Sequence, residues 1–409
     1  MDAVSPVTVP AAPPGAAADQ GRVPDAAPHP GTPARLTADP AREPAIALRG
    51  SPLIDALDAA ALRGRGGAAF PAAVKWRAVR SAPCVVVANG AEGEPASWKD
   101  RYLLRARPGL VLDGLLLAAE ALGAVRALLY VGRPEDEAAV RTALARHPGA
   151  GGVEVVAVAD RYVAGEETAV VRAVNDGIAM PTVKPPRPFE RGIDGRPTLV
   201  QNVETLAHAA WIARHGAEAF RAVGTAGSPG TALVTVDGAV SEVALGTPLS
   251  ELFAARDQAV PPPAVLAGGY FGGLLAPDRF GLPLDYDAFR AAGSGLGCAA
   301  FGVVRDCPVD TAVRVAHYLA AESSRQCGVC LNGTRAMAEA LGRVATGHAA
   351  PDDPANLARW SETLPGRGAC ALLDGAALLV RSLLGGFPGA VAAHLDHGCA
   401  VCAAERSTS

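Results

Sequence analysis

Residues 84–95 have the sequence Cys-Val-Val-Val-Ala-Asn-Gly-Ala-Glu-Gly-Glu-Pro, and this stretch decides the fold class. Its first five residues are apolar and rich in β-branched side chains, which predicts a buried strand. Its second half is a polar loop at the carboxyl end of that strand, where α/β folds bind ligands. Further along, the pattern predicts a helix at 110–123, a strand at 127–131, a helix at 134–146 and a strand at 153–158. This alternation predicts a layered α/β domain with a mainly parallel sheet.

The segments on either side of this domain have a different character. Asp237 and Gly238 separate two apolar segments, which is a strong signal for a β-hairpin. The first 45 residues are rich in Ala and Pro, so we expect a disordered tail whose removal changes stability little. The predicted organisation is a disordered tail (1–45), an α/β domain (46–226), a small β-grasp-type, SLBB-like domain (227–277), a linker and helical bundle (278–395) and a cysteine-containing tail (396–409).

Composition excludes several functional classes. The formal net charge is −4 and there is no long basic run, so we expect no nucleic-acid partner. No uninterrupted apolar stretch reaches the roughly 18 residues that a membrane span needs, and the first residues do not form a secretory signal. These features predict a cytoplasmic protein. Its eight cysteines are then expected to bind metals or to remain thiols rather than to form disulfides.

A glycine-rich segment precedes the first predicted strand. Gly64, Gly66 and Gly67 allow backbone N–H groups to approach an anion closely, and Lys75 adds a positive charge. This pattern favours a phosphate site, although an ordinary glycine-rich surface turn has the same composition.

Two later loops carry polar residues suited to a sugar or a polar ring. Asn89 can both donate and accept hydrogen bonds, while Glu92 and Glu94 can accept them. Glu166 and Glu167 follow a glycine, and such a pair suits ribose hydroxyls. A solvated acidic loop is the alternative explanation for these carboxylates.

Taken in order, these elements resemble the NADH-binding flavoprotein subunit of respiratory complex I and its relatives in NAD-linked hydrogenases and formate dehydrogenases. The resemblance covers about residues 48–390. It rests on seven segments in the family's order: 63–76, 89–95, 165–169, 184–186, 195–198, 202–205 and 293–297.

The resemblance implies a Rossmann-like domain that binds FMN and NADH, followed by a helical domain with an iron–sulfur site. Glu94 is the residue implied beside the reacting nicotinamide, where orientation matters more than acid–base chemistry. Electrons would then pass singly through a [4Fe–4S] cluster to a partner such as a ferredoxin or a membrane reductase subunit. The implied cofactor contacts are Gly64, Arg65, Gly66, Gly67, Phe70, Lys75, Asn89, Glu92, Tyr162, Gly165, Glu166, Glu167, Lys184, Gln201, Asn202 and Thr205.

The implied cluster ligands depart from the family pattern. Cys327, Cys330 and Cys370 match three ligand positions, but Ser324 stands at the fourth. Four thiolates are usual for such a cluster, so it is expected to be serine-ligated, labile or absent. The tail pair Cys399 and Cys402 offers two alternatives: one of its thiols replaces the missing ligand, or the two Cys-x-x-Cys pairs bind zinc. The three remaining cysteines are interpreted as ordinary core residues: Cys84, Cys298 and Cys307.

The nucleotide pocket also departs from the family. Ala78 and Arg187 replace aromatic residues that usually hold the adenine, while Ala69 and Ala91 replace Gly and Asp. Arg187 can stack on the adenine or pair with a 2′-phosphate, but the paired glutamates favour NADH. Because of these changes, a non-catalytic subunit and a flavoprotein with reversed electron flow or another donor remain as alternatives.

Overall fold

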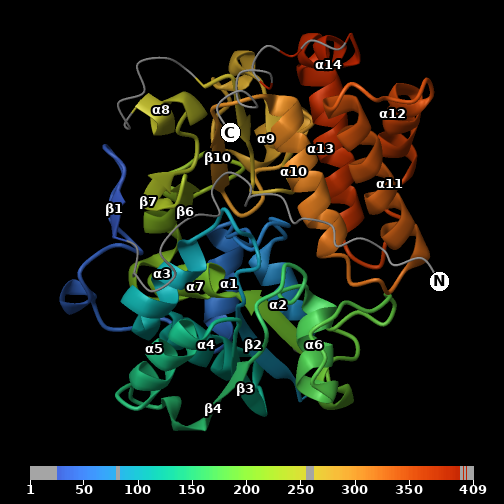
Figure 1. The fold of residues 1–409 in the computed structure, drawn as a ribbon. Helices are drawn as coiled ribbons and strands as arrows, with labels where there is room; N and C mark the ends of the chain where they lie inside the picture. The colour runs from blue at the N-terminus through green and yellow to red at the C-terminus, as the bar shows by residue number, and fades with distance from the viewer. Residues whose placement is uncertain (1–24, 80–82, 255–261, 397–398, 400–401, 403–409) are drawn as a thin grey trace.

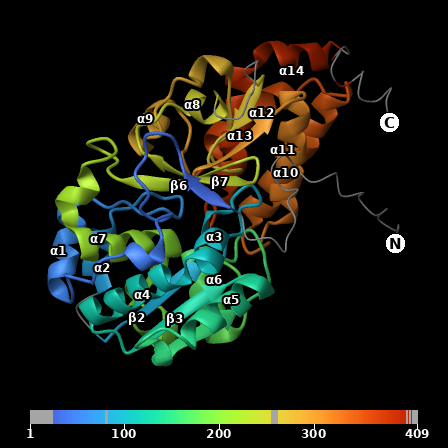
Figure 2. The same ribbon diagram turned by 90° about the vertical axis from the view of Figure 1, so that its left-hand side faces the viewer.

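The computed structural model describes residues 25–79, 83–254, 262–396, 399 and 402. They form three parts: an α/β layer, a mixed sheet above it, and a helical bundle beside that sheet (Figures 1 and 2). The mixed α/β class and the C-terminal helices agree with the sequence-based expectation. Four short 3-10 helices lie in connecting segments: η1 (Pro40–Arg42), η2 (Ala150–Gly152), η3 (Ile193–Gly195) and η4 (Pro277–Arg279).

The α/β layer is built on a parallel sheet with the strand order β4-β3-β2-β5. Its strands are β2 (Val85–Gly90), β3 (Arg126–Val131), β4 (Val153–Ala157) and β5 (Thr198–Asn202). In β2, Val86 and Ala88 join one apolar cluster, whereas Val85 and Val87 join another. Successive side chains of a strand point to opposite faces, so β2 is buried on both sides, as its apolar run predicted.

Helices cover both faces of this sheet. One apolar cluster is built by α1 (Ser51–Ala59), α2 (Ala72–Val79), α3 (Lys99–Ala106), α4 (Pro108–Leu122) and α7 (Val203–Arg221). On the other face, α6 (Glu167–Asp176) contributes Val170 and Ala173. α5 (Pro134–Leu144) packs against α4 and β4. Gly123 ends α4 in the left-handed conformation, which glycine adopts without steric cost.

The second sheet has the strand order β1-β7-β6-β10-β8-β9. Asp237 and Gly238 both have positive φ, at 45° and 82°, as the expected tight hairpin between β6 and β7 requires. β10 pairs with β6 and β8 although it lies beyond residue 277, where the small domain was predicted to end. The elements of this part are β1 (Ala26–Pro28), β6 (Thr231–Val236), β7 (Ala239–Ala244), α8 (Leu249–Ala254), β8 (Ala264–Leu266), β9 (Leu274–Leu275), α9 (Tyr286–Ala291) and β10 (Ala300–Val304).

The prediction of a disordered tail is wrong for residues 25–45, while residues 1–24 lie outside the described part. β1 pairs in parallel with β7, and Leu36 is fully buried. The buried carboxylate of Glu242 accepts backbone N–H bonds from Arg35, Leu36 and Thr37 at 2.9–3.1 Å. Composition missed this segment because one leucine and one distant carboxylate, rather than a periodic apolar pattern, hold it in place.

The C-terminal helices form a bundle with one apolar cluster. They are α10 (Pro308–Ala321), α11 (Gly328–Ala345), α12 (Asp353–Thr363), α13 (Leu372–Gly386) and α14 (Pro388–Leu395). Among the described residues, no single helix has the length and apolar composition of a membrane span. α13 and α14 meet that test only as a pair, and they are bent by 89° relative to each other.

Candidate functional site

The glycine turn, residues 64–70, lies at the carboxyl edge of the parallel sheet. The Gly64 N–H donates to the Phe70 carbonyl at 2.8 Å and closes the turn. A side chain at Gly66 would place its Cβ 3.1 Å from the Cβ of Asn202, at the end of β5. Within the described chain, the N–H groups of Gly66 and Gly67 have no hydrogen-bond partner. The turn therefore presents adjacent free donors beside a strand end, an arrangement that binds anions.

Arg65 holds this turn in place from the inside. Its backbone N–H donates to Thr205 Oγ1 at 2.9 Å. Its side chain is 2% exposed and donates to the carbonyls of Arg63, Pro229 and Thr231. Arg65 was expected among the cofactor contacts. In the structure its guanidinium instead bonds to three backbone carbonyls and so connects the turn to β6.

Two lysines and two glutamates form a chain of ion pairs next to the turn. Lys184 Nζ lies 2.6 Å from Glu166 Oε1 and 3.7 Å from Glu167 Oε1. Lys75 Nζ lies 3.3 Å from Glu167 Oε2. Glu166 also caps α6, because its Oε2 accepts the N–H groups of Thr168 and Ala169. The capping interaction fixes the position of the whole chain of charges.

Asn89, at the end of β2, connects two of the predicted loops. Its Nδ2 donates to the Gly165 carbonyl at 2.8 Å. A Cβ at Gly165 would lie 2.7 Å from the Ala91 carbonyl, and one at Gly93 would lie 2.5 Å from the Tyr162 carbonyl. Both glycines are therefore required for close packing of the two loops, a role that the sequence did not indicate.

Glu92 and Gln201 have different surroundings. Glu92 is buried, and its carboxylate accepts from Ser97 Oγ at 2.5 Å and from the first N–H groups of α3. This carboxylate, expected near a flavin ring, stabilises the start of a helix. Gln201 Oε1 is buried and has no partner among the described residues. An unpaired buried acceptor is unfavourable, so a ligand donor at this position would be stabilising.

Glu94 lies within a cluster of aromatic residues. Its Oε2 accepts from Tyr162 Oη and from the Tyr270 N–H, each at 3.0 Å. Burial raises the pKa of Glu94 to about 7. Tyr162 in turn stacks on Phe271 with ring centroids 5.6 Å apart. A buried carboxyl group with a raised pKa is a common feature of functional sites, and the role expected for Glu94 beside the nicotinamide stays a prediction.

Sequence reasoning missed a buried charge network under the site. Lys99 Nζ lies 2.6 Å from Asp100 Oδ1, 3.1 Å from Glu204 Oε2 and 3.4 Å from Asn202 Oδ1. Burial alone would lower the pKa of Lys99, but the two carboxylates raise it. Asn202 also donates to Asp100 Oδ2 at 2.8 Å. Three consecutive charged residues after Trp98, immediately downstream of the loop, were the available signal for this network.

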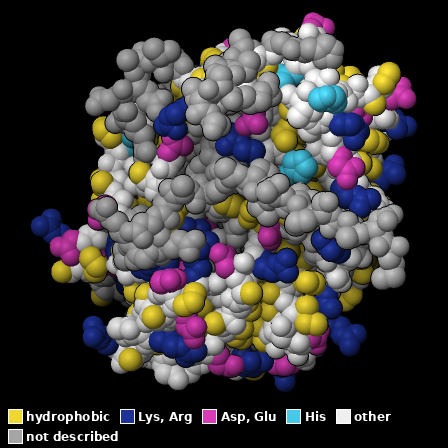
Figure 3. All heavy atoms as spheres, viewed as in Figure 1, with side chains coloured by type: hydrophobic (Ala, Val, Ile, Leu, Met, Phe, Trp, Pro, Cys, Tyr) yellow, Lys and Arg dark blue, Asp and Glu magenta, His cyan; other side chains and the backbone are white. Residues whose placement is uncertain are grey.

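A cavity of about 200 Å³ opens next to the Glu94 loop. Three arginines line it, Arg101, Arg133 and Arg161, together with Asp160 and Glu322. On the outer face seen in Figure 3, basic and acidic side chains of the described residues are interspersed. Each arginine is paired with a carboxylate, Arg101 with Glu92, Arg133 with Asp160 and Arg161 with Glu322, so the charges of this cavity are largely balanced.

Cys327, Cys330 and Cys370 come together where α10, α11 and α13 meet the α/β layer. Cys327 precedes α11, Cys330 lies in its first turn and Cys370 lies just before α13. Burial raises the pKa of the Cys370 thiol, and the nearby charges of Glu166 and Lys184 also act on it. Cys370 therefore lies within electrostatic range of Glu166 and Lys184.

A second serine, next to the expected Ser324, contacts one of these cysteines. Ser323 Oγ lies 3.6 Å from Cys330 Sγ and is buried. Ser324 is partly exposed, and its backbone carbonyl accepts from the Gln326 side chain at 3.2 Å. The motif places Ser324 at the ligand position, and that assignment stays a prediction.

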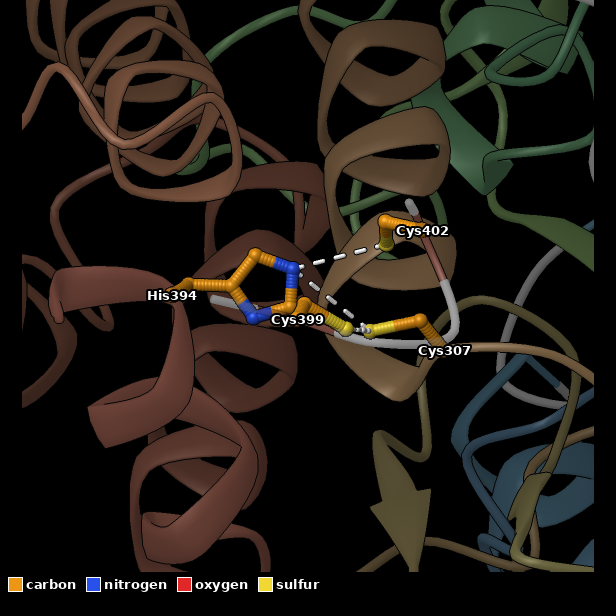
Figure 4. Close-up of side chains that lie close together, drawn as sticks. All are labelled: Cys307, His394, Cys399 and Cys402. Carbon is orange, nitrogen blue, oxygen red and sulfur yellow. Dashed lines mark hydrogen bonds between the residues drawn. The ribbon is translucent and has the colours of Figure 1, made fainter. Parts of the chain in front are cut away.

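The interpretation of Cys307 as an isolated core residue is wrong. Cys307, His394, Cys399 and Cys402 have ligand atoms that all lie within 4.8 Å of one another (Figure 4). The pair Cys399 and Cys402 thus gathers with Cys307 and His394 rather than with Cys327. The sequence separation of 92 residues between Cys307 and Cys399 concealed this Cys/His cluster.

Comparison with known proteins supports the resemblance. Residues 57–211 match the family described as the Nuo51 FMN-binding domain, and residues 310–394 match the NADH-ubiquinone oxidoreductase-F iron-sulfur binding region. One of the NADH-quinone oxidoreductase F subunits of Rhizobium meliloti is 33% identical over 365 residues, which are 82% of this chain and 86% of that protein. The NADH-quinone oxidoreductase F subunit of Mycobacterium bovis is 32% identical over 88% of each chain.

Solved structures show the same fold. The crystal structure of an NAD+-reducing [NiFe]-hydrogenase in the H2-reduced state matches with a TM-score of 0.77 at 33% identity. The match covers 84% of this chain and 62% of the hydrogenase chain, and the air-oxidized state gives a TM-score of 0.78 with 88% and 66% covered. The chain thus spans about two thirds of those hydrogenase chains. From its sequence, its two matched domains and its fold, the chain belongs to the family of NADH-quinone oxidoreductase F subunits.

Proposed function

We propose that this chain accepts a hydride from NADH at a bound FMN and passes single electrons through a [4Fe–4S] cluster to a partner redox protein. FMN, when bound, supplies an acceptor that takes two electrons together and releases them one at a time. The observation that carries the proposal is the pair of free N–H groups at Gly66 and Gly67, beside Asn202 at the carboxyl edge of the sheet. Membership of the family supports it.

The residues of the site fit a flavin nucleotide. The glycine turn binds the phosphate, with Lys75 close by to balance its charge. Gln201 Oε1, buried and unpaired, fits a ring N–H donor. Phe70 is 52% exposed on the same turn and offers a face on which the second nucleotide can stack.

The residues around Glu94 position the nicotinamide and hold a proton. Tyr162 and the Tyr270 N–H fix the carboxyl group through two hydrogen bonds. Because the pKa of Glu94 is raised to about 7, this group can retain or release a proton near neutral pH. We assign it a positioning role, since hydride transfer itself needs alignment of the two rings.

NADH is the proposed donor in preference to NADPH. Glu166 and Glu167 lie where the ribose is expected, and their charges oppose an added 2′-phosphate. Lys184 offsets part of that charge through its ion pairs with both carboxylates. Arg187 is exposed and covers the position of an aromatic residue usual in the family.

The cluster ligands are proposed to be Cys327, Cys330, Cys370 and Ser324. The charges of Glu166 and Lys184 act on Cys370, which supports electron transfer from the proposed nucleotide site to the cluster. The relatives are named as subunits of quinone reductases, and the solved matches are hydrogenases, so a redox complex is the expected setting. We propose a cytoplasmic location, free or peripheral to a membrane complex.

A glycine replacement tests the phosphate assignment. Gly66→Val forces its side chain against Asn202, so the turn must shift and FMN content per chain should fall at least tenfold. Gly151→Val is the matched control, because nothing lies within 4 Å of its Cβ, and it should retain FMN. Flavin is measured by absorbance and fluorescence after anaerobic purification. A wild-type protein that neither contains nor takes up FMN would favour the non-catalytic alternative.

A further inference from the structure

The Cys/His cluster joins three elements at the far end of the helical bundle. Cys307 immediately precedes α10, His394 lies in the last turn of α14, and Cys399 and Cys402 follow that helix. Cys307 and His394 are each 2% exposed, and Cys402 is 8% exposed. We propose that these four residues bind one structural zinc ion, separate from the redox centre.

The distances between the ligand atoms fit a single tetrahedral ion. Cys307 Sγ and Cys402 Sγ lie 3.7 Å and 3.5 Å from His394 Nε2, and Cys399 Sγ lies 3.9 Å from Cys307 Sγ. Zinc bonds of about 2.3 Å to sulfur and about 2.0 Å to nitrogen in a tetrahedron separate two sulfurs by about 3.8 Å and a sulfur from a nitrogen by about 3.6 Å. A cluster of several irons would hold its thiolates further apart.

The imidazole of His394 is oriented for coordination. Its Nδ1 lies 2.8 Å from the Ala390 carbonyl, which can only accept a hydrogen bond. Nδ1 therefore carries the proton, and the lone pair of Nε2 points toward the three sulfurs (Figure 4). A carbonyl that orients a histidine in this way is the usual second partner of a metal-bound imidazole.

The sulfur of Cys307 also accepts hydrogen bonds from the backbone. The backbone N–H groups of Val309 and Asp310, in the first turn of α10, hydrogen-bond to it. Burial raises the pKa of the Cys307 thiol and these two donors partly offset that effect; a bound cation would favour the thiolate, the form of cysteine that binds zinc. Four protein ligands fill a tetrahedral ion completely, so the site is structural rather than catalytic.

The cluster is remote from the proposed iron site. α10 has 14 residues, so its ends lie about 20 Å apart at a rise of about 1.5 Å per residue. Cys307 immediately precedes the N-terminus of α10, whereas Cys327 follows the C-terminus of α10. The ion would fasten the chain that follows α14 to the start of α10, and each site should load its metal without the other.

Metal analysis of the full-length protein tests the proposal. The protein is purified anaerobically without chelator, and zinc and iron per chain are measured by mass spectrometry. Wild type and the buried control Cys84→Ala should each contain one zinc. Cys307→Ala and Cys402→Ala should lose at least nine tenths of it while keeping their iron. Cys327→Ala should do the reverse.

Two further measurements keep the proposal testable if the alanine variants fail to fold. His394→Cys offers a fourth thiolate and should retain zinc. Wild-type protein stripped of zinc and titrated with Co²⁺ should bind one ion with the absorption of a tetrahedral thiolate complex. The proposal is overturned if wild type contains no zinc and binds no Co²⁺ stoichiometrically, if iron occupies this site, or if zinc is lost from Cys327→Ala and kept in Cys307→Ala.

Discussion

At the scale of single residues, the proposed site depends on the free N–H groups of the glycine turn and on the carboxyl group of Glu94. The sequence could propose both, because glycine spacing and acidic loops are local signals. It did not show that Glu92 and Arg65 are used internally, by the start of α3 and by backbone carbonyls. Which partner a polar side chain selects depends on elements distant in sequence.

The raised pKa of Glu94 predicts a specific pH dependence of stability. Below about pH 4.5 the carboxyl group is protonated in both the folded and the unfolded state, so it has no effect. As the pH rises to about 7, the unfolded state ionises first, and the stability of the folded state decreases. Glu94→Gln keeps the acceptor for Tyr162 and removes this loss.

The free energy of unfolding of Glu94→Gln relative to wild type should therefore increase between pH 5 and pH 8. The limit is about 3 kcal/mol, at about 1.4 kcal/mol per pKa unit, and partial solvent contact reduces it. The exposed control Glu362→Gln should show no such trend. Denaturant unfolding at several pH values measures the effect, and parallel curves for wild type and Glu94→Gln would show that Glu94 is ionised throughout.

At the scale of elements, several strands and helices followed from periodicity, but α7, the longest helix among the described residues with 19 residues, did not. β2, β3 and β4 lie within two residues of their predicted limits, and Asp237-Gly238 forms the expected hairpin. β1 and β10 could not be predicted in this way. β1 gains its stability from β7, more than 200 residues away, and β10 completes a sheet across the predicted domain limit.

The packed N-terminal segment carries a measurable share of stability. Leu36 is fully buried among the residues of the main apolar cluster. Leu36→Ala should lower the free energy of unfolding by about 2–5 kcal/mol, the usual cost of such a cavity. Val125→Ala is a suitable control, because Val125 is 54% exposed and should change stability by less than about 0.5 kcal/mol. Equal stability of Leu36→Ala and wild type would indicate that this segment does not pack on the rest of the protein.

At the scale of the whole molecule, the fold brings Glu166, a proposed nucleotide residue, into electrostatic range of Cys370, a proposed cluster ligand. α6 carries Glu166 at its start, and the same charge acts on Cys370 before α13. The sequence predicted each group separately from its motif. Their proximity, and the gathering of Cys307 with Cys399 and Cys402, depend on how the bundle packs, which spacing alone does not specify.

An anaerobic titration with NADH tests the central claim most directly. In FMN-loaded wild type, NADH should bleach the flavin absorbance and then produce the electron paramagnetic resonance signal of a reduced cluster, with NADPH slower. In Cys370→Ala the flavin should still bleach without that signal. A flavin that NADH leaves oxidised, or a cluster reduced equally well in flavin-free Gly66→Val, would contradict transfer from NADH through FMN to the cluster.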